Sequence, residues 1–435
     1  MRLNGIEVGD YTSTFREVAL RFHTPSFVFD VDCFRSRLRN FRQLVRAKFD
    51  AKGISTSVSY AAKAFLCTEL VGILADEGLN IDCCSLLEAK TALRGSMRGG
   101  QIGLHGNNKS DAELKLALEN DFHAVFIDSL DEIVRVEDIA KALDKTANII
   151  LRLTTGVHAG GHEFISTAHE DQKFGLSVSS TSGADSVALQ AVEQVLACEH
   201  LKLQGVHSHI GSQIASPDGF LASAEKLLEF RLHVKSRFGV LLETLDLGGG
   251  FGIQYLDTDP ELDLTQLFES LQGLISEHSK ANQLPLPSLV FEPGRWVIGP
   301  CMFMVYTVGT IKDVEYSAGM FRRYVSVDGG MADNIRPMLY GAKYSCYALT
   351  FEPSDDTTAC RVVGKHCESG DILIDDVQLP KSLKRNDLLV IPSVGAYSYS
   401  MSSNYNMLPK PAVIALENGR VREMIKRQDE SEIIR

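Results

Sequence analysis

The stretch ISTSVSYAAKAF (residues 54–65) begins the pattern from which the fold is predicted. Its first seven residues, 54–60, are rich in β-branched and aromatic side chains, which is typical of a strand. Lys63 follows directly, between small and apolar neighbours. Because burying an ammonium group without a partner is costly, this lysine is either a solvated loop residue or is held there for chemistry.

Strand-like runs continue to alternate with helical segments after this stretch. Seven further runs follow, at 79–84, 101–106, 123–128, 148–155, 203–210, 243–249 and 288–294. Amphipathic segments such as 111–120 and 218–238 lie between them. Eight alternating units over this length predict a (β/α)8 TIM barrel, which we place at residues 33–300. An open doubly wound sheet is the competing architecture, but it seldom uses eight such regular units.

Short alternating runs separated by turns take over after Pro300. Examples are DILIDDVQL (371–379) and DLLVIPSVGAY (387–397), and together such runs predict an all-β domain, a β-sandwich or β-barrel, over 301–435. The strand SFVFDV (26–31) lies outside the barrel count, so we expect the region 1–32 to pack with this second domain. The long connection at 156–184 is of the kind that serves a site more often than it merely links elements.

Composition and charge argue against several classes of protein. The chain has 435 residues, a net charge of −12 and no dense stripe of Lys and Arg, which argues against a nucleic-acid partner. Its start lacks the basic and apolar regions of a signal peptide, and no apolar run approaches the length of a membrane span. The nine cysteines contain no CxxC pair, which favours reduced thiols over a disulfide framework or a zinc site. We therefore expect a cytoplasmic protein with no membrane contact and no metal.

Unusual polar residues fall at the carboxyl ends of the predicted barrel strands, where barrels carry their active sites. In chain order they are Lys63, Asp82, HGNNK (105–109), His207, His209, Gly211–Gln213, the glycine run 248–252 and Glu292–Arg295. The glycine run follows the seventh strand, a common phosphate site in barrels, although a tight turn without a ligand is an alternative. A lysine that can form a Schiff base, a phosphate cradle and an acid for a ring nitrogen together suggest pyridoxal phosphate.

Seven motifs, in this order, resemble those of the diaminopimelate decarboxylases, which are fold-type III pyridoxal-phosphate enzymes. They are VSYAAKAF (58–65), HSHIGSQ (207–213), GGGFG (248–252), EPGR (292–295), DGGMADNIRPMLY (328–340), GKHCESGD (364–371) and GAY (395–397). The match runs through almost the whole chain, and the segments 105–114 and 162–175 resemble the actinobacterial branch in particular. The resemblance implies a barrel of the alanine racemase type, pyridoxal 5'-phosphate as cofactor, and decarboxylation of meso-2,6-diaminopimelate to L-lysine, the last step of lysine biosynthesis.

The resemblance also implies roles for individual residues. Lys63 would be the catalytic Schiff-base lysine, and Cys367 would act near the reacting carbon in proton delivery after carbon dioxide leaves. The implied cofactor-binding residues are Lys63, His209, Ser212, Gly250, Glu292, Pro293, Gly294, Arg295 and Tyr397. The implied substrate-binding residues are Arg295, Arg336, Tyr340, Glu368 and Tyr397, with the arginines on a distal carboxylate because their planar forks donate two hydrogen bonds. In this family the CESGD segment comes from the other subunit, which implies a homodimer with shared active sites.

Several of these residues have a plainer interpretation. Taken alone, Lys63 would be a solvated loop lysine, His209 a core histidine, Arg336 a surface arginine and Cys367 a buried structural thiol. Asp82 and Glu88 match acidic positions of related decarboxylases. The segment CSLLEA (84–89) departs from the family, which has a glycine before that glutamate, so Glu88 has either a supporting or a purely structural role.

Three other functions compete with this prediction. The nearest is a related fold-type III decarboxylase that acts on another amino acid or on a siderophore precursor. An amino-acid racemase is disfavoured because such racemases keep the ring nitrogen unprotonated opposite an arginine, whereas Glu292 favours an electron sink. A catalytically inactive binding protein on the same fold is disfavoured by the presence of both Lys63 and Cys367.

Overall fold

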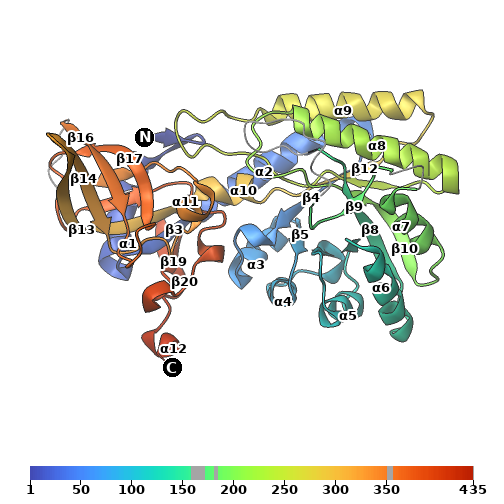
Figure 1. Cartoon of the computed structure of the whole chain (residues 1–435). Coiled ribbons are helices and arrows are strands. Elements are labelled where there is room, and N and C mark those ends of the chain that lie inside the picture. The colour runs from blue at the N-terminus through green and yellow to red at the C-terminus, as the bar shows by residue number, and fades with distance from the viewer. Residues whose placement is uncertain (158–171, 181–184, 350–355, 435) are drawn as a thin grey trace. The chain divides into compact units, whose positions relative to one another are not determined.

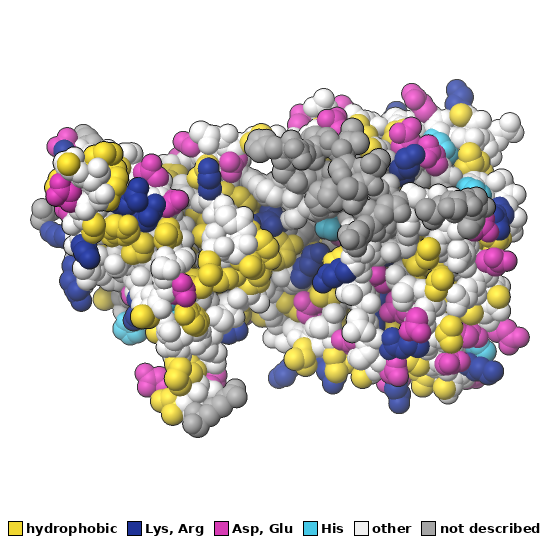
Figure 2. Space-filling model, in the orientation of Figure 1, with side chains coloured by type: hydrophobic (Ala, Val, Ile, Leu, Met, Phe, Trp, Pro, Cys, Tyr) yellow, Lys and Arg dark blue, Asp and Glu magenta, His cyan; other side chains and the backbone are white. Residues whose placement is uncertain are grey.

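The computed structural model describes residues 1–157, 172–180, 185–349 and 356–434, which belong to two compact units. The barrel unit comprises residues 38–252 and 261–294, and the β unit comprises 1–37, 253–260 and 295–435. None of the described helices is long and apolar enough to cross a bilayer. On the face shown in Figure 2, acidic and basic side chains are interspersed, and this face has no broad patch of one sign.

The barrel unit contains a closed ring of eight parallel strands (Figure 1). They are β4 (Thr56–Ala61), β5 (Asn80–Cys83), β6 (Ile102–Leu104), β7 (Ala124–Ile127), β8 (Ala147–Thr154), β10 (Leu201–His207), β11 (Thr244–Asp246) and β12 (Ser288–Phe291). Each strand pairs with the next, and the pairing of Leu289 with Thr56 joins the last strand to the first. The short β9 (Leu176–Ser177) adds to β8. The predicted TIM barrel is confirmed, and every predicted barrel strand overlaps an observed one.

Amphipathic helices connect the barrel strands. They are α3 (Thr68–Asp76), α4 (Leu86–Arg94), α5 (Asp111–Glu119), α6 (Leu130–Ala142), α7 (Val187–Leu196), α8 (Asp218–Phe238) and α9 (Leu264–Ala281). Helices α8 and α9 pack side by side (Figure 1). Ser85 and Ser129 each accept a backbone N–H as the N-cap of α4 and α6. Because these caps directly follow β5 and β7, they also fix the short loops at the carboxyl ends of those strands.

The β unit is built around a sheet that joins distant parts of the chain. Its larger strands are β3 (Ser26–Asp30), β13 (Met302–Ser317), β14 (Met320–Val327), β16 (Thr357–Val363), β17 (Ile372–Pro380), β18 (Leu388–Ile391), β19 (Ala412–Glu417) and β20 (Arg420–Ile425). Shorter elements are β1 (Arg2–Leu3), β2 (Ile6–Glu7), α1 (Thr12–Phe22), α10 (Arg295–Ile298), α11 (Arg336–Tyr340), β15 (Tyr347–Leu349) and α12 (Glu430–Ile433), while α2 (Val31–Lys48) contains the boundary at Arg37. Strand β3 lies between β13, which it pairs antiparallel, and β19, which it pairs parallel. A buried core of Phe15, Val28, Phe303, Val390 and Ile414 packs against this sheet.

Candidate active site

A cavity of about 410 Å³ is lined by residues at the carboxyl ends of the barrel strands. The volume lies in the range of small-molecule sites, and the position is the one at which barrels carry out chemistry. The predicted residues that line it are Lys63, Asp82, His105, Gly106, His207, His209, Gly211, Ser212 and Glu292. The fold thus brings together side chains from β4, β5, β10 and β12.

Lys63 lies in a single turn, η3 (Ala62–Ala64), directly after β4. Its side chain is exposed and lines the cavity, while Ala62 and Ala64 are buried. A Cβ added to Gly294 would lie 3.1 Å from the Cβ of Ala61 and 3.3 Å from that of Ala64. The small residues around Lys63 therefore allow the turn at Gly294 to pack closely against the backbone that carries the lysine.

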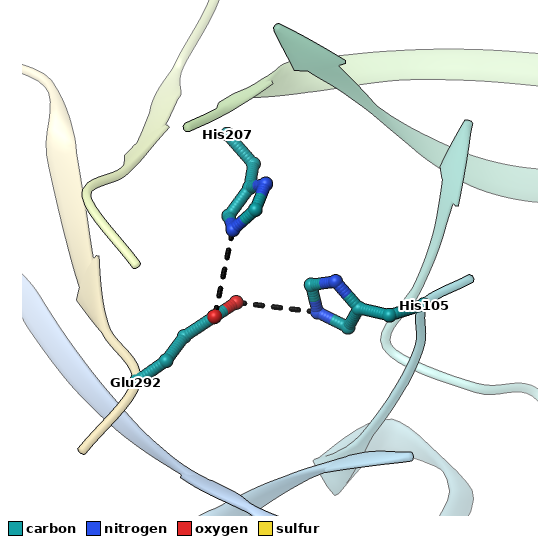
Figure 3. Close-up of side chains that lie close together, drawn as sticks. All are labelled: His105, His207 and Glu292. Atoms are coloured by element: carbon teal, nitrogen blue, oxygen red, sulfur yellow. Dashed lines mark ion pairs between the residues drawn. The ribbon is translucent and has the colours of Figure 1, made fainter. Parts of the chain in front are cut away.

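Glu292 lies between two histidines (Figure 3). Its Oε1 is 3.2 Å from His105 Nε2, and its Oε2 is 3.4 Å from His207 Nε2. All three side chains are buried. Burial opposes ionisation of Glu292, but the two histidines outweigh it and hold the pKa of its carboxyl well below the usual range. Glu292 is therefore a carboxylate at neutral pH.

The two histidines have different charges. Burial lowers the pKa of His207 to about 4, so this ring is neutral at pH 7. Burial also opposes the charge on His105, but Glu292 and Asp82 more than compensate and raise the pKa of that ring. Of the two rings beside Glu292, His105 is therefore the one that is more readily protonated.

Two further carboxyl groups are buried near this cluster. Burial and the charge of Glu292 raise the pKa of Asp82, and the same causes raise the pKa of Asp246 well above its usual range. Asp82 Oδ1 is 3.6 Å from His105 Nε2, and Asp246 Oδ1 accepts the N–H of Gly248 at 2.9 Å. The barrel thus favours ionisation of one carboxyl group, Glu292, over the other two.

His209 lies beside the glycine run. Burial and the charge of Lys63 lower the pKa of His209 well below its usual range, so the ring is neutral. Its Nδ1 accepts the N–H of Gly249 at 3.3 Å. Gly250 has φ +106°, and a Cβ there would lie 2.6 Å from the carbonyl oxygen of Gly211. Only glycine lets the GGGFG run approach Gly211 and Ser212 this closely.

Arg152 was not predicted, although it lines the cavity. Its guanidinium lies 4.3 Å from the ring centroid of Phe174 and 3.8 Å from Asp128 Oδ2. The signal in the sequence was an arginine inside the apolar strand at 148–155, because burying a charge without a partner is costly. Phe174 and Gln172 bring the connection at 156–184 to the cavity, whereas residues 158–171 and 181–184 lie outside the described part of the chain.

Glu88 organises the loop after β5. Its carboxylate accepts the backbone N–H of Cys84 at 2.7 Å, and its own N–H donates to Ser85 Oγ at 3.2 Å. Leu87 stands where the family has glycine, and 73% of it is exposed. The leucine that stands in place of the family's glycine therefore points to solvent. Both hydrogen bonds of Glu88 are left in place.

The predicted arginines of the β unit form one group with tyrosines. Arg295 hydrogen-bonds to the hydroxyl of Tyr255, and its guanidinium lies 4.8 Å from the ring centroid of Tyr397. Arg336 hydrogen-bonds to the hydroxyl of Tyr344 and lies 4.9 Å from the ring centroid of Tyr255. Arg336 is buried, and no described carboxylate pairs with it. Tyr255 and Tyr344 had not been predicted, because nothing local in their segments marks them.

The other predicted residues of the β unit lie at its surface. Tyr340, at the end of α11, is 64% exposed, and Cys367 is also exposed. The backbone N–H of Cys367 donates to Asn406 Oδ1 at 2.9 Å. Glu368 Oε2 accepts a hydrogen bond from the Tyr405 hydroxyl at 3.4 Å.

The residues of the barrel cavity suit pyridoxal phosphate. Lys63 supplies an amine, and Glu292 Oε1 is a buried carboxylate oxygen without a hydrogen-bond donor among the described residues. A protonated ring nitrogen would satisfy that oxygen. The ligand atoms of His105, His207 and Glu292 lie within 4.8 Å of one another, a spacing also found in metal sites. Lys63 and Arg152 line the same cavity and would repel a metal cation.

Comparison with known proteins identifies the family. A family model described as "Pyridoxal-dependent decarboxylase, pyridoxal binding domain" matches residues 33–299. The diaminopimelate decarboxylase of Mycobacterium tuberculosis (strain H37Rv) is 44% identical over 96% of this chain and 92% of that protein. The chain belongs to the diaminopimelate decarboxylase family. The diaminopimelate decarboxylase of Bacillus subtilis (strain 168) is 38% identical over 99% of this chain and 94% of that protein.

A solved structure of the diaminopimelate decarboxylase family shares the fold. The diaminopimelate decarboxylase of M. jannaschii in complex with L-lysine has a TM-score of 0.86 and 28% identity, over 96% of this chain and 93% of that one. The resemblance inferred from the seven motifs is confirmed, as are the fold class and pyridoxal phosphate as the cofactor. Like its family, the chain is a pyridoxal-dependent decarboxylase.

Proposed function

We propose that the chain converts meso-2,6-diaminopimelate to L-lysine and carbon dioxide in the cytoplasm, as the last step of lysine biosynthesis. The reaction is that of its family. The choice of substrate within the decarboxylases rests on one observation, the buried Arg336 that no described carboxylate neutralises. A buried charge without a partner is costly, so this guanidinium is suited to a carboxylate brought by the substrate.

The barrel residues would hold the cofactor and keep one proton in place. Lys63 would hold it through the amine, and Ser212 with the glycine run at 248–252 would bind its phosphate. Pyridoxal phosphate, when bound, withdraws the electron pair left on the substrate carbon as carbon dioxide departs. Glu292, as a carboxylate, would accept a hydrogen bond from the protonated ring nitrogen. The neutral His209 would lie against the face of the ring. Pro293 and Gly294 would fix the turn that carries Glu292.

The β-unit residues would choose the substrate. Arg295 and Arg336 would bind the distal carboxylate, each already supported by a tyrosine hydroxyl, with Tyr340 completing that contact. Glu368 would bind the distal amine, and Tyr397 would contact both phosphate and substrate. A site with an unpaired buried arginine rejects an analogue that lacks the carboxylate, by roughly 10⁴-fold.

Cys367 would return a proton to the carbon from which carbon dioxide has left. A positioned general acid contributes roughly 10²–10⁴-fold. We place Cys367 and Glu368 in the active site of a partner subunit, so that the working form is a homodimer. The exposure of Cys367 agrees with a role outside the core of its own β unit.

The test is product formation by the purified holoenzyme. We expect lysine and carbon dioxide from meso-diaminopimelate, with ornithine and lysine turned over at least about 10³-fold more slowly. Arg336→Met should lose most activity toward diaminopimelate, while the matched surface variant Arg323→Met, whose partner is the exposed Asp313, should retain it. Failure to form lysine from diaminopimelate would overturn the proposal, and faster turnover of ornithine would favour the rival decarboxylase.

A further inference from the structure

Three buried carboxyl groups of the barrel unit compete for ionisation. Asp246 on β11 and Glu292 just after β12 are buried, the Asp82 side chain on β5 is 11% exposed, and each charged group would repel the others. Electron withdrawal by the cofactor requires the negative charge to stand on Glu292, which faces the ring nitrogen in the proposed function. The structure must therefore contain contacts that favour ionisation of Glu292 over that of the two aspartates.

The contacts of the cluster are asymmetric. Both oxygens of Glu292 have a histidine nitrogen within 3.4 Å, whereas the histidine contact of Asp82 among the described residues is the longer one of 3.6 Å to His105. Asp246 forms no ion pair with the described residues, and one of its oxygens accepts a backbone N–H. His105 is the one ring that contacts two of the competing carboxyl groups. It is closer to Glu292 than to Asp82.

The ring of His105 is held in this position. It stacks on Phe126 with centroids 3.6 Å apart and planes at 19°, and it meets the edge of His207 at 5.1 Å. Its backbone N–H donates to the carbonyl of Cys83 at 2.8 Å. The ring therefore cannot turn away from Glu292 without disturbing its packing.

The HGNNK segment is locked by its own lysine. Lys109 is only 3% exposed, and its ammonium donates to the carbonyl oxygens of Gly106 at 2.7 Å and Phe126 at 2.5 Å. It also pairs with Glu132 at 2.9 Å. Gly106 follows His105 in the chain, and Phe126 stacks on the His105 ring. Lys109 therefore fixes both the loop that carries His105 and the residue on which its ring stacks.

We propose that His105 is a positioning residue that, as the imidazolium, keeps the negative charge on Glu292 rather than on Asp82 or Asp246. In this way it keeps the proton on the cofactor's ring nitrogen. The inference rests on the proposed function of Glu292. The charged and titratable groups that face His105 or its partners from the surrounding strands are Asp82 on β5, Arg152 on β8, His207 on β10, His209 after β10, Asp246 on β11 and Glu292 after β12.

The test compares His105→Gln with the wild-type holoenzyme. We expect kcat to fall roughly 10- to 100-fold with little change in KM, as for other outer partners of a catalytic group. With ¹⁵N-labelled pyridoxal phosphate bound, the ring nitrogen should be protonated in the wild type and largely neutral in His105→Gln at pH 7. His200→Gln is the matched control, because His200 also pairs with a glutamate of the barrel, Glu137 at 2.9 Å, but does not line the cavity.

A second pair of variants keeps the inference testable if His105→Gln folds poorly. Asp82→Asn removes one of the two carboxyl groups that favour the imidazolium of His105, so its ring nitrogen should lose its proton at lower pH than in the wild type. The double variant His105→Gln/Asp82→Asn should resemble His105→Gln, because Asp82 acts through His105. A ring nitrogen equally protonated in wild type and His105→Gln, or a pH profile unmoved in Asp82→Asn, would overturn the proposal. Wild-type enzyme that makes no lysine would instead overturn the proposed function.

Discussion

Two buried clusters in this chain are made of the same residue types but differ in how fully their atoms are bonded. In the barrel unit, Glu292 meets two histidines at ion-pair distances, yet its Oε1 has no hydrogen-bond donor among the described residues. In the β unit, Asp371 accepts from the Met331 N–H at 2.7 Å and from both the backbone N–H and the ring of His366, at 2.9 Å and 2.7 Å. The cluster around Glu292 therefore has a carboxylate oxygen available to a ligand. In the other cluster, the carboxylate of Asp371 is already used in hydrogen bonds that hold loops together.

This difference gives a physical criterion for separating site from scaffold. A buried carboxylate with several well-formed hydrogen bonds stabilises the fold, because its desolvation is compensated locally. A buried carboxylate without a hydrogen-bond donor destabilises the fold unless a ligand supplies the donor. On this criterion Glu292 should matter for activity and Asp371 for stability.

The largest expected effect is the loss of activity in the Glu292→Gln variant. The amide keeps the shape but cannot carry the charge, so we expect kcat to fall roughly 10³-fold, as when a charge-stabilising group is removed. The free energy of unfolding of the apoprotein should not fall, because a neutral side chain is easier to bury. Steady-state assays and urea unfolding measure the two effects. A variant that loses stability but not activity would reverse the comparison.

The next effect concerns Asp333 in the DGGMADN motif. Burial raises the pKa of its carboxyl to about 7, against 3.8 for the ordinary value. Between about pH 4 and pH 7 the unfolded chain therefore releases a proton that the folded β unit retains. The stability of the β unit should consequently decrease as pH rises through this window, by about 4 kcal/mol in total.

Asp333→Asn should flatten this pH dependence. Trp296 is the single tryptophan of the chain and belongs to the β unit, so its fluorescence in urea reports the unfolding of that unit. The exposed Asp313→Asn is the control and should leave the slope unchanged. A slope that persists in Asp333→Asn would show that another group is responsible.

A somewhat smaller loss is expected for Asp371→Asn. The amide can accept fewer of the three hydrogen bonds and places a donor against backbone N–H groups, which should cost about 3 kcal/mol. The Trp296 unfolding midpoint in urea should fall accordingly. Asp375→Asn is the matched control, since the Asp375 side chain is 76% exposed and pairs with Arg361 at the surface. Equal midpoints for the two variants would remove the proposed role of Asp371 as scaffold.

The smallest effect is expected for Leu87→Gly, which restores the family's glycine. Because Leu87 is exposed on α4, the change should cost only about 1 kcal/mol of helix stability. The hydrogen bonds of Glu88 should persist, and kcat should be unchanged. A clear gain in kcat would mean that the departure at CSLLEA alters the cavity.

Local sequence pattern was enough to predict the barrel and much of its cavity. Six of the eight predicted strands ended in unusual residues, and parallel strands bring their carboxyl ends to one mouth, so Lys63, His209 and Glu292 had to converge. Arg152 was missed, although an arginine inside an apolar strand was a usable signal. The HGNNK and HSHIG motifs marked His105 and His207 but not their contact with Glu292, because side-chain pairing across a barrel depends on strand register.

The β unit was less predictable in detail. The partners of Arg336 and Asp371 come from segments separated by loops, and no periodicity links them. Tyr344 and Tyr255 support the two arginines from positions that look ordinary in the sequence. The roles of Arg295, Arg336, Tyr340, Cys367, Glu368 and Tyr397 remain predictions, of which Arg336→Met tests the one for Arg336.

The central position of β3 has a consequence for the newly made chain. Its partners β13 and β19 begin at Met302 and Ala412, so this strand of apolar residues leaves the ribosome long before either of them. At typical rates of 5–20 residues per second, the wait for β19 is roughly 20 to 80 s. During that time SFVFD has two open hydrogen-bonding edges and a composition prone to aggregation. Yield in the cell should therefore depend on chaperones that shield the first thirty or so residues during translation.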